Sequence, residues 1–168
     1  MLIEGIRHHI AALLWGSCLL LAGSAYADAI AVVAPKGLAE PAALSLQDLR
    51  ALYLGNSRSF GGSSLTPSDH DASTRIYASF TQAVIGRSRR ALENYWLEEI
   101  LSGGKEPPRQ IDGDPAVARH VATNPGTIGY VSWAWLESQK GLGVRIIKIR
   151  HKGRTLAPGD PGYPLRID

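Results

Sequence analysis

Cysteine is almost absent from this chain of 168 residues, which contains one cysteine, one methionine and two phenylalanines. The cysteine, Cys18, lies near the amino terminus inside an apolar run. A chain cut beyond that run has no thiol, so neither a disulfide nor a thiolate-bound metal contributes to it. The rest of the composition is that of a globular protein, with 45% hydrophobic and 20% charged residues.

Long hydrophobic runs are also scarce. The apolar run at residues 10–22 contains 13 residues, too few to cross a bilayer comfortably. Arg7 precedes this run and Ala25-Tyr26-Ala27 follows it, as in a secretory signal peptide with small residues at its cleavage site. We therefore predict a signal peptide at residues 1–27.

Cleavage after Ala27 leaves residues 28–168, which are short enough for a single domain and which we expect in the periplasm. Contact with a membrane is then predicted only through the uncleaved signal segment. Two alternatives stay open, namely a signal segment retained as an anchor and a lipid attached at Cys18.

A strong charge of one sign is missing as well. The chain has 18 basic and 15 acidic residues, for a net charge of +3. No basic stripe with interleaved aromatic residues is present, so we predict no nucleic-acid partner. A net positive charge of this size is common among soluble proteins, and it is also compatible with an anionic ligand.

The usual sequence motifs of catalysis are absent. Gly103-Gly104-Lys105 has neither the earlier glycine nor the following hydroxyl residue of a P-loop. His70, His120 and His151 do not have metal-ligand spacing. There is no Gly-x-Ser-x-Gly motif. We predict a protein that is not an enzyme and that has no cofactor and no metal site.

The chain does contain an alternation of short apolar runs and amphipathic segments, which is typical of an α/β domain. A loop rich in Gly, Ser and Pro is predicted at residues 55–72, with Leu65 and Thr66 as its strand candidates. Strands are predicted at residues 30–34, 127–131 and 144–149, and helices at residues 44–54, 74–85, 88–101, 114–124 and 132–139.

Capping residues mark where several of these helices begin. Ser45 with Asp48 three residues later is a short-acid form of the capping box, and Ser88 precedes another helix. Asp71 or Ser73 is expected to cap the helix at residues 74–85, and Asp114 the helix that follows it.

The apolar stripes of two helices predict their buried faces. Leu92, Trp96 and Ile100 recur every four residues, so we expect all three in the core. Val117 and Val121 show the same spacing in the helix at residues 114–124 and are predicted as its buried pair.

The most polar junction between a loop and a helix contains Asp71, Ser73, Thr74 and Arg75. A helix begins with unpaired N–H groups and a partial positive charge, which attract anions. The two hydroxyls and the guanidinium would complete an anion site. A capped helix with solvated charges explains the same residues, and composition alone does not choose between the two.

A resemblance favours the anion site. The chain resembles the phosphate-binding proteins of high-affinity phosphate ABC transporters, a family of periplasmic substrate-binding proteins. The likeness extends from residue 29 to about residue 165 and is carried by five segments in order: Leu46 to Gly55, Asp71 to Arg75 before Phe80, Trp96, Asn124-Pro125-Gly126-Thr127-Ile128-Gly129-Tyr130-Val131, and Tyr163-Pro164-Leu165.

The resemblance implies an α/β fold that forms one lobe of a type II periplasmic-binding-protein-like fold, a mixed sheet flanked by helices. It implies that Ser73, Thr74, Arg75 and Asp71 bind phosphate or a related small oxyanion for transport or sensing, with an ABC transporter component or another envelope protein as partner. Two departures favour an alternative function. The family's loop glycines are missing here, and a full receptor is about twice as long. The alternative is a non-catalytic envelope module that binds another protein and has a degenerate ligand site.

Overall fold

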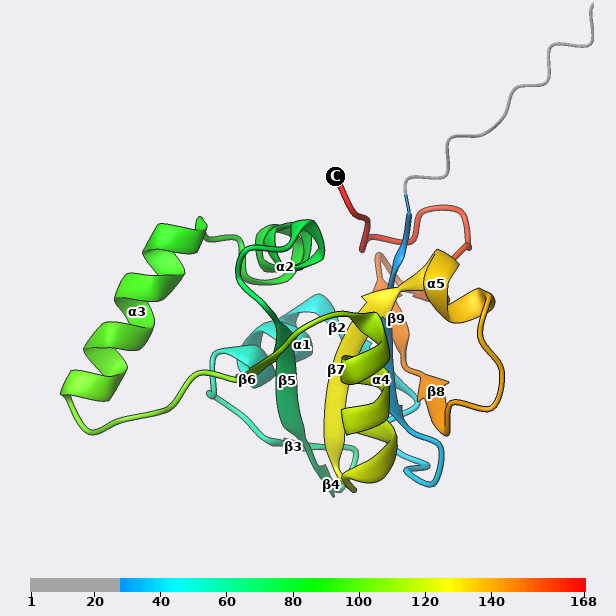
Figure 1. Cartoon of the computed structure of the whole chain (residues 1–168), viewed down its shortest axis with the longest axis horizontal. Coiled ribbons are helices and arrows are strands. Elements are labelled where there is room, and N and C mark those ends of the chain that lie inside the picture. Colours follow the sequence, from blue (N-terminus) through cyan, green and yellow to red (C-terminus); the bar gives the residue numbers. More distant parts are fainter. Residues whose placement is uncertain (1–27) are drawn as a thin grey trace, which may run out of the picture.

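The computed structural model describes residues 28–168, and its centre is a five-stranded mixed sheet with helices on both faces (Figure 1). In order across the sheet, the strands are β6 (Arg109–Ile111), β5 (Thr66–His70), β7 (Thr127–Ser132), β1 (Ile30–Pro35) and β8 (Val144–Ile146). β5 is parallel to β6 and β7, whereas β1 is antiparallel to β7 and β8. The predicted mixed α/β fold and the strands at residues 30–34 and 127–131 are confirmed.

Two smaller sheets complete the strands of the described chain. One contains β10 (Arg154–Leu156), β9 (Lys148–His151) and β2 (Ala43–Ser45), and the other contains β3 (Ser59–Phe60) and β4 (Ser63–Ser64). The prediction of one strand at residues 144–149 is wrong, because the segment divides at Ile147 into β8 and β9 of different sheets. The Ile147 N–H donates to the carbonyl of Val32 at 2.8 Å, so the turn between the sheets stays bonded to β1.

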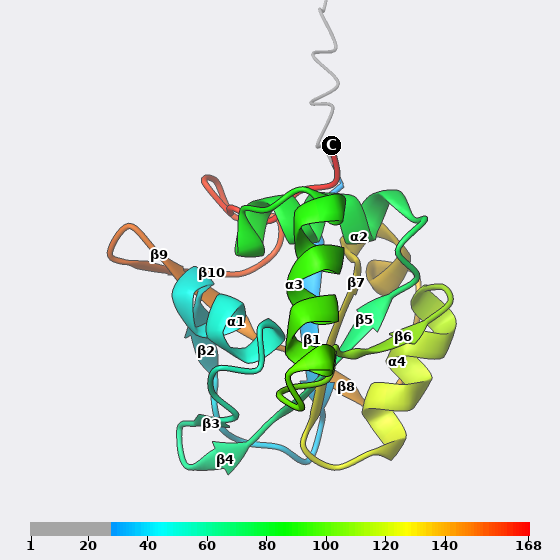
Figure 2. The ribbon, with the colours of Figure 1, turned by 90° about the vertical axis from the view of Figure 1, so that its left-hand side faces the viewer.

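The helices form two layers on opposite faces of the large sheet (Figure 2). The first layer and its core contain α1, α2, η1 and α3, and the second contains α4 and α5. Their bounds are α1 (Leu46–Tyr53), α2 (Arg75–Phe80), the π-helical turn η1 (Thr81–Ile85), α3 (Arg89–Leu101), α4 (Asp114–Thr123) and α5 (Trp133–Glu137).

β1 separates the two cores. Ile30 and Val32 pack into the core beneath α1 and α2, whereas Ala31 and Val33 pack into the core beneath α4. All four side chains are fully buried. Burial on both faces explains why this strand is an uninterrupted apolar run in the sequence rather than an alternating one.

α4 lies close against β7 because Gly129 has no side chain. A Cβ atom at residue 129 would lie 2.8 Å from the Ser68 Oγ, 2.9 Å from the Val117 Cγ1 and 3.1 Å from the Val121 Cγ2. Both valines are fully buried, which confirms the predicted buried pair of α4. The depth of α4 on the sheet therefore depends on this glycine.

Two predicted helix caps are confirmed. The Asp48 N–H donates to the Ser45 Oγ at 3.0 Å, and the Ser45 N–H donates to the Asp48 carboxylate at 2.8 Å. Ser88 caps α3 in the same way, through the N–H of Ala91. The predicted helix at residues 44–54 begins later than expected, at Leu46, because Leu44 pairs in β2.

Other predicted boundaries are corrected. Thr74, rather than Asp71 or Ser73, is the N-cap of α2, because its hydroxyl accepts from the N–H of Tyr77 at 3.3 Å. Gly113 is the N-cap of α4, so Asp114 is the first helical residue.

Two further expectations are wrong, one about the burial of a side chain and one about secondary structure. Ile100 was expected in the core, but 54% of it is exposed, because the last turn of α3 extends beyond the body of the domain. Part of the predicted loop at residues 55–72 is β5, which lies inside the large sheet.

The predicted signal peptide, residues 1–27, lies outside the described residues, so cleavage after Ala27 and the alternatives at Cys18 stay predictions. Within residues 28–168, no helix has the length and apolar character needed to cross a membrane. α3 is the longest helix of this part of the chain, with 13 residues.

Candidate functional site

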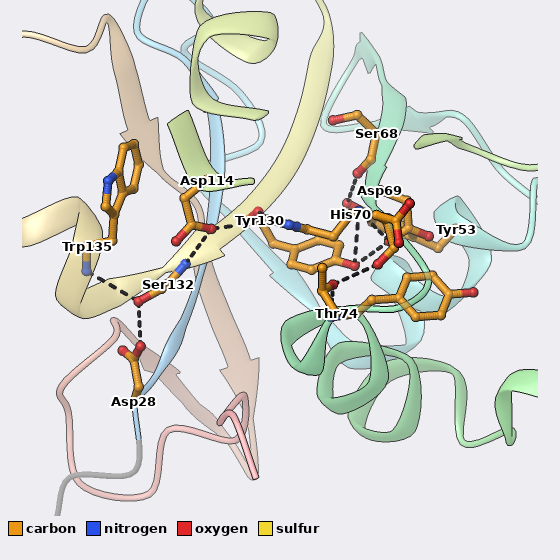
Figure 3. Close-up of polar contacts among 12 residues, drawn as sticks. Asp28, Tyr53, Ser68, Asp69, His70, Thr74, Asp114, Tyr130, Ser132 and Trp135 are labelled. Atoms are coloured by element: carbon orange, nitrogen blue, oxygen red, sulfur yellow. Dashed lines mark hydrogen bonds and ion pairs between the residues drawn. The ribbon is translucent and has the colours of Figure 1, made fainter. Parts of the chain in front are cut away.

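The candidate site lies where the parallel strands β5 and β7 end (Figure 3). β5 ends at His70 and leads through a short turn into α2, and α4 begins beside it at Asp114. In open α/β sheets, ligands bind outside the carboxyl ends of the strands. The structure therefore places the junction singled out in the sequence at the edge of the sheet where a ligand is expected.

The four predicted site residues lie in one turn before and at the start of α2. The Asp71 carboxylate accepts from the Ser73 N–H at 2.8 Å and from the Ser73 hydroxyl at 2.5 Å. The Thr74 hydroxyl donates to the Asp71 carbonyl at 2.7 Å while it caps α2. Arg75 is exposed, and its guanidinium donates to the carbonyl of Asp168 at 3.0 Å.

Asp71 is the acidic residue of this turn. The two hydrogen bonds from Ser73 lower the pKa of the Asp71 carboxyl below its usual value, so the group is ionised at neutral pH. It supplies negative charge near the partial positive charge at the start of α2. The first N–H groups of a helix have no partner inside it, and those of Arg75 and Ile76 have no other partner among the described residues.

Beneath the turn lies a buried carboxyl group that the sequence did not mark, that of Asp69. It accepts from the His70 N–H at 3.0 Å and from the Tyr130 hydroxyl. Burial raises the pKa of Asp69 to about 7, although the two hydrogen bonds lower it in part. Near neutral pH this carboxyl is therefore present both as an acid, which donates, and as a carboxylate, which only accepts.

Tyr130 holds Asp69 in place through an aromatic cluster. Its ring stacks on Phe80 with centroids 3.8 Å apart, and Tyr53 packs against both rings. The Tyr53 hydroxyl donates to the carbonyl of Ser68 at 3.0 Å. The cluster closes the floor of the site and excludes water from one side of Asp69. The sequence predicted the strand of Tyr130 but not this role.

His70 joins the site to α4. Its Nε2 lies 2.8 Å from the carbonyl of Tyr130, so this nitrogen carries the proton and donates. The same nitrogen lies 3.5 Å from the Asp114 carboxylate, which in turn accepts from the N–H of Ser132 at 3.2 Å. Burial lowers the pKa of His70, so the ring is neutral at pH 7.

The acidic and imidazole side chains of the site do not form a metal centre. Among residues 28–168, no group of three or more His, Cys, Asp and Glu side chains has an arrangement that could hold a metal ion. Asp69 and His70 instead use their polar atoms on protein partners. Asp114, whose pKa is raised mainly by burial, accepts from a backbone N–H.

Sequence comparison adds no family. No protein-family model matches the chain, and no curated protein matches it in sequence. The information about relatives therefore comes from the fold alone.

Solved structures of phosphate-transport receptors share the fold. A protein from Clostridium perfringens, described as a phosphate ABC transporter substrate-binding protein and solved with bound phosphate, is 16% identical, with a TM-score of 0.54 over 73% of this chain and 45% of its own. PstS from Borrelia burgdorferi is 13% identical, with a TM-score of 0.56 over 73% and 47%. A phosphate transport receptor from Vibrio cholerae is 15% identical, with a TM-score of 0.53 over 73% and 46%.

The chain spans less than half the length of these proteins. At 12–16% identity the likeness establishes the fold and not the ligand. It bears out the predicted resemblance in the arrangement of the mixed sheet and its helices. The chain therefore has the fold of about half of a phosphate-type periplasmic substrate-binding protein.

Proposed function

We propose that this protein binds phosphate or a related small oxyanion at the turn formed by Asp71, Ser73, Thr74 and Arg75, for transport or sensing in the periplasm. One observation carries the proposal: the unpaired N–H groups of Arg75 and Ile76 begin α2 just after the carboxyl end of β5, and Arg75 also supplies an exposed guanidinium. Backbone N–H groups and a guanidinium are the donors that bind oxyanions in proteins. The fold shared with phosphate-transport receptors supports the same ligand.

Asp71 selects among oxyanions. Its carboxylate is ionised and only accepts hydrogen bonds. A ligand at this turn therefore needs a proton of its own to donate, and hydrogen phosphate carries one at neutral pH whereas sulfate does not. Ser73 now donates to Asp71 and would turn its hydroxyl toward the ligand. The proposal thus predicts that phosphate binds more tightly than sulfate.

The test is a calorimetric titration of the purified protein with inorganic phosphate, repeated with sulfate. Arg75→Ala removes a charge-assisted contact of about 1.5–3 kcal/mol, so the affinity for phosphate should fall roughly ten- to a hundredfold. Arg119→Ala is the matched control, since Arg119 is an exposed arginine on α4 outside the turn. The melting temperature should rise with phosphate, because a ligand of the native state stabilises it.

Export is part of the same proposal. A mature protein that begins at Asp28 should be found in the periplasmic fraction, and mass spectrometry of its amino-terminal peptide checks the cut after Ala27. An intact segment of residues 1–27 on that protein would contradict the periplasmic assignment.

A second candidate function, contact with another envelope protein, is favoured by the end of α3. Leu97, Ile100 and Leu101 are 55%, 54% and 77% exposed there, and exposed apolar patches mark interaction sites. The phosphate titration separates the two candidates. A folded protein that gains no stability from millimolar phosphate would overturn the oxyanion site and leave this second function.

A further inference from the structure

A cavity lies at the opposite end of β5 from the candidate site. Its volume is about 470 Å³, and it is bounded by the start of β5 and β7, by the side of α3 and by the link that leads from α3 to β6. Volumes of this order accommodate small organic molecules. Its lining includes Arg58, Trp96, Glu106, Pro107, Arg109 and His120.

Two arginines of this cavity have no counter-charge. Within the described part of the chain, neither Arg58 nor Arg109 forms an ion pair or a side-chain hydrogen bond. Glu106 also lines the cavity, so its one carboxylate faces two guanidiniums that it does not contact within 4 Å. With two guanidiniums and one carboxylate, the cavity carries a net positive charge. Burial and the nearby charge of Arg109 lower the pKa of His120, so its ring is neutral and adds no charge.

His120 adds a directed hydrogen-bond donor. Its Nδ1 lies 3.2 Å from the side-chain amide nitrogen of Asn124, which can only donate, so Nδ1 accepts. In a neutral ring the proton is then on Nε2, which has no hydrogen-bond partner among residues 28–168. The cavity therefore presents two guanidiniums and one N–H group, all of which bind the oxygen atoms of an anion.

The lining also includes apolar residues, among them Trp96 and Pro107, beside the polar Thr66, Asn124 and Thr127. Pro107 is exposed there, and Trp96, which is otherwise buried in the core, borders the cavity with the part of its ring that is not covered. The link is fixed by Lys105, whose amine donates to the Asn56 side chain at 2.7 Å and to the Tyr95 hydroxyl at 3.1 Å. An apolar surface gains free energy when a flat hydrocarbon body covers it.

We propose that this cavity binds a small organic anion, an oxyanion head group on a flat apolar body, with Arg58, Arg109 and the His120 Nε2–H on the head group and Trp96 and Pro107 on the body. The head group pairs with the two guanidiniums that have no other partner among the residues described, and the apolar body covers the apolar side chains of the cavity. Inorganic phosphate satisfies only the first of these contacts. The site is separate from the turn at Asp71 to Arg75, and its existence does not depend on the function proposed for that turn.

The probe is benzoate, titrated into the purified protein by calorimetry, with acetate and benzyl alcohol as controls for the head group and the body. We expect benzoate to bind at least tenfold more tightly than either control. Arg58→Ala/Arg109→Ala should weaken benzoate binding at least tenfold, whereas Arg119→Ala and Arg75→Ala should change it less than twofold. Both cavity arginines are exposed, so the double variant should keep the melting temperature of the unmodified protein.

Three results would overturn the inference: no benzoate binding at millimolar concentration, acetate binding as tightly as benzoate, or an equal loss in Arg119→Ala. Retained binding in Arg58→Lys/Arg109→Lys, weaker than in the unmodified protein, would support the forked guanidinium contacts. A phosphate titration keeps the two proposals apart. Phosphate binding lost in the cavity double variant but kept in Arg75→Ala would move the oxyanion site here and refute the site at the turn.

Discussion

The two ends of β5 differ in how their polar groups are satisfied. At the carboxyl end, Asp69 and His70 are buried and bonded to Tyr130. At the amino end, Arg58 and Arg109 are exposed without a charged partner in the described chain, beside the α3 helix that leaves apolar side chains in water. The first end is stabilised from within, so a ligand there must compete with internal partners. The second offers donors that are free.

Of the substitutions that compare the two ends of β5, Tyr130→Ala should lower the free energy of unfolding the most. The substitution removes a fully buried ring that stacks on Phe80, and it leaves the Asp69 carboxyl with the His70 N–H as its remaining donor. The free energy of unfolding should fall by about 3–5 kcal/mol in denaturant titration. Tyr130→Phe keeps the ring and should cost about 1–3 kcal/mol through the loss of the hydroxyl hydrogen bond to the buried Asp69 carboxyl alone. A loss below about 1 kcal/mol in Tyr130→Ala would show that the carboxyl end is not the stable one.

The pH dependence of the free energy of unfolding should reveal the raised pKa of Asp69. Its pKa is about 7 in the folded protein and close to 3.9 in the unfolded chain. Between these values the folded protein binds more protons, so the free energy of unfolding falls as pH rises from 4 to 7. Asp69→Asn should lack this fall, and the two proteins should diverge by on the order of 3 kcal/mol across the window.

His70 provides the check on that measurement. Its lowered pKa makes the unfolded chain bind more protons near pH 6, which raises stability as pH increases. This opposite slope is present in both proteins and cancels in their difference. Parallel stability curves for the unmodified protein and Asp69→Asn would mean that Asp69 is ionised throughout the window.

A smaller effect is expected on α3. Trp96 is 9% exposed and is one of the two residues that this helix buries in the core. Trp96→Ala should lower the free energy of unfolding by about 3 kcal/mol, the low end for such a change, because the residue borders a cavity that water can enter. Chemical denaturation checks it. A cost above that of Tyr130→Ala would reverse the order of the two regions.

The smallest effect is expected from Leu97→Ser and Leu101→Ser. Both side chains are more than half exposed, so each change should alter the free energy of unfolding by less than about 0.5 kcal/mol. Leu92→Ser, on the buried face of the same helix, is the control and should cost several times more. Equal losses in all three variants would mean that α3 packs on both faces.

Local signals in the sequence predicted much of this fold. Ser45 with Asp48 and Ser88 begin helices as expected, because capping depends on residues within one turn of each other. The strand β1 was predicted from a short apolar run, and β7 from its β-branched and aromatic residues; both strands are buried on both faces.

The failures have a shared physical cause. β5 was missed because Ser68, Asp69 and His70 look like loop residues, yet they are buried among partners that lie 60 residues away in the chain. Ile100 follows the spacing of the core stripe, but the last turn of α3 has nothing beneath it to cover. Periodicity reports which face of a helix is apolar, and it does not report how far the neighbouring layer extends.

The candidate site was predicted only in its outer part. Asp71, Ser73, Thr74 and Arg75 stand together in the sequence, so a polar turn before a helix could be recognised. Asp69 and Tyr130 meet only after β5 and β7 pair, and no local pattern links them. Their contact is a product of strand register, which the sequence of either strand alone does not specify.

Gly129 influences the protonation of His70, although the two residues belong to different strands. The glycine lets Val117 and Val121 approach the sheet, and the start of the same helix holds Asp114 within 3.5 Å of His70. A methyl group at residue 129 would crowd Val117 and Val121 and push α4 away from the sheet. Asp114 would then move away from the His70 imidazole. The tendency of His70 to take up a proton is thus governed in part by a residue that has no side chain.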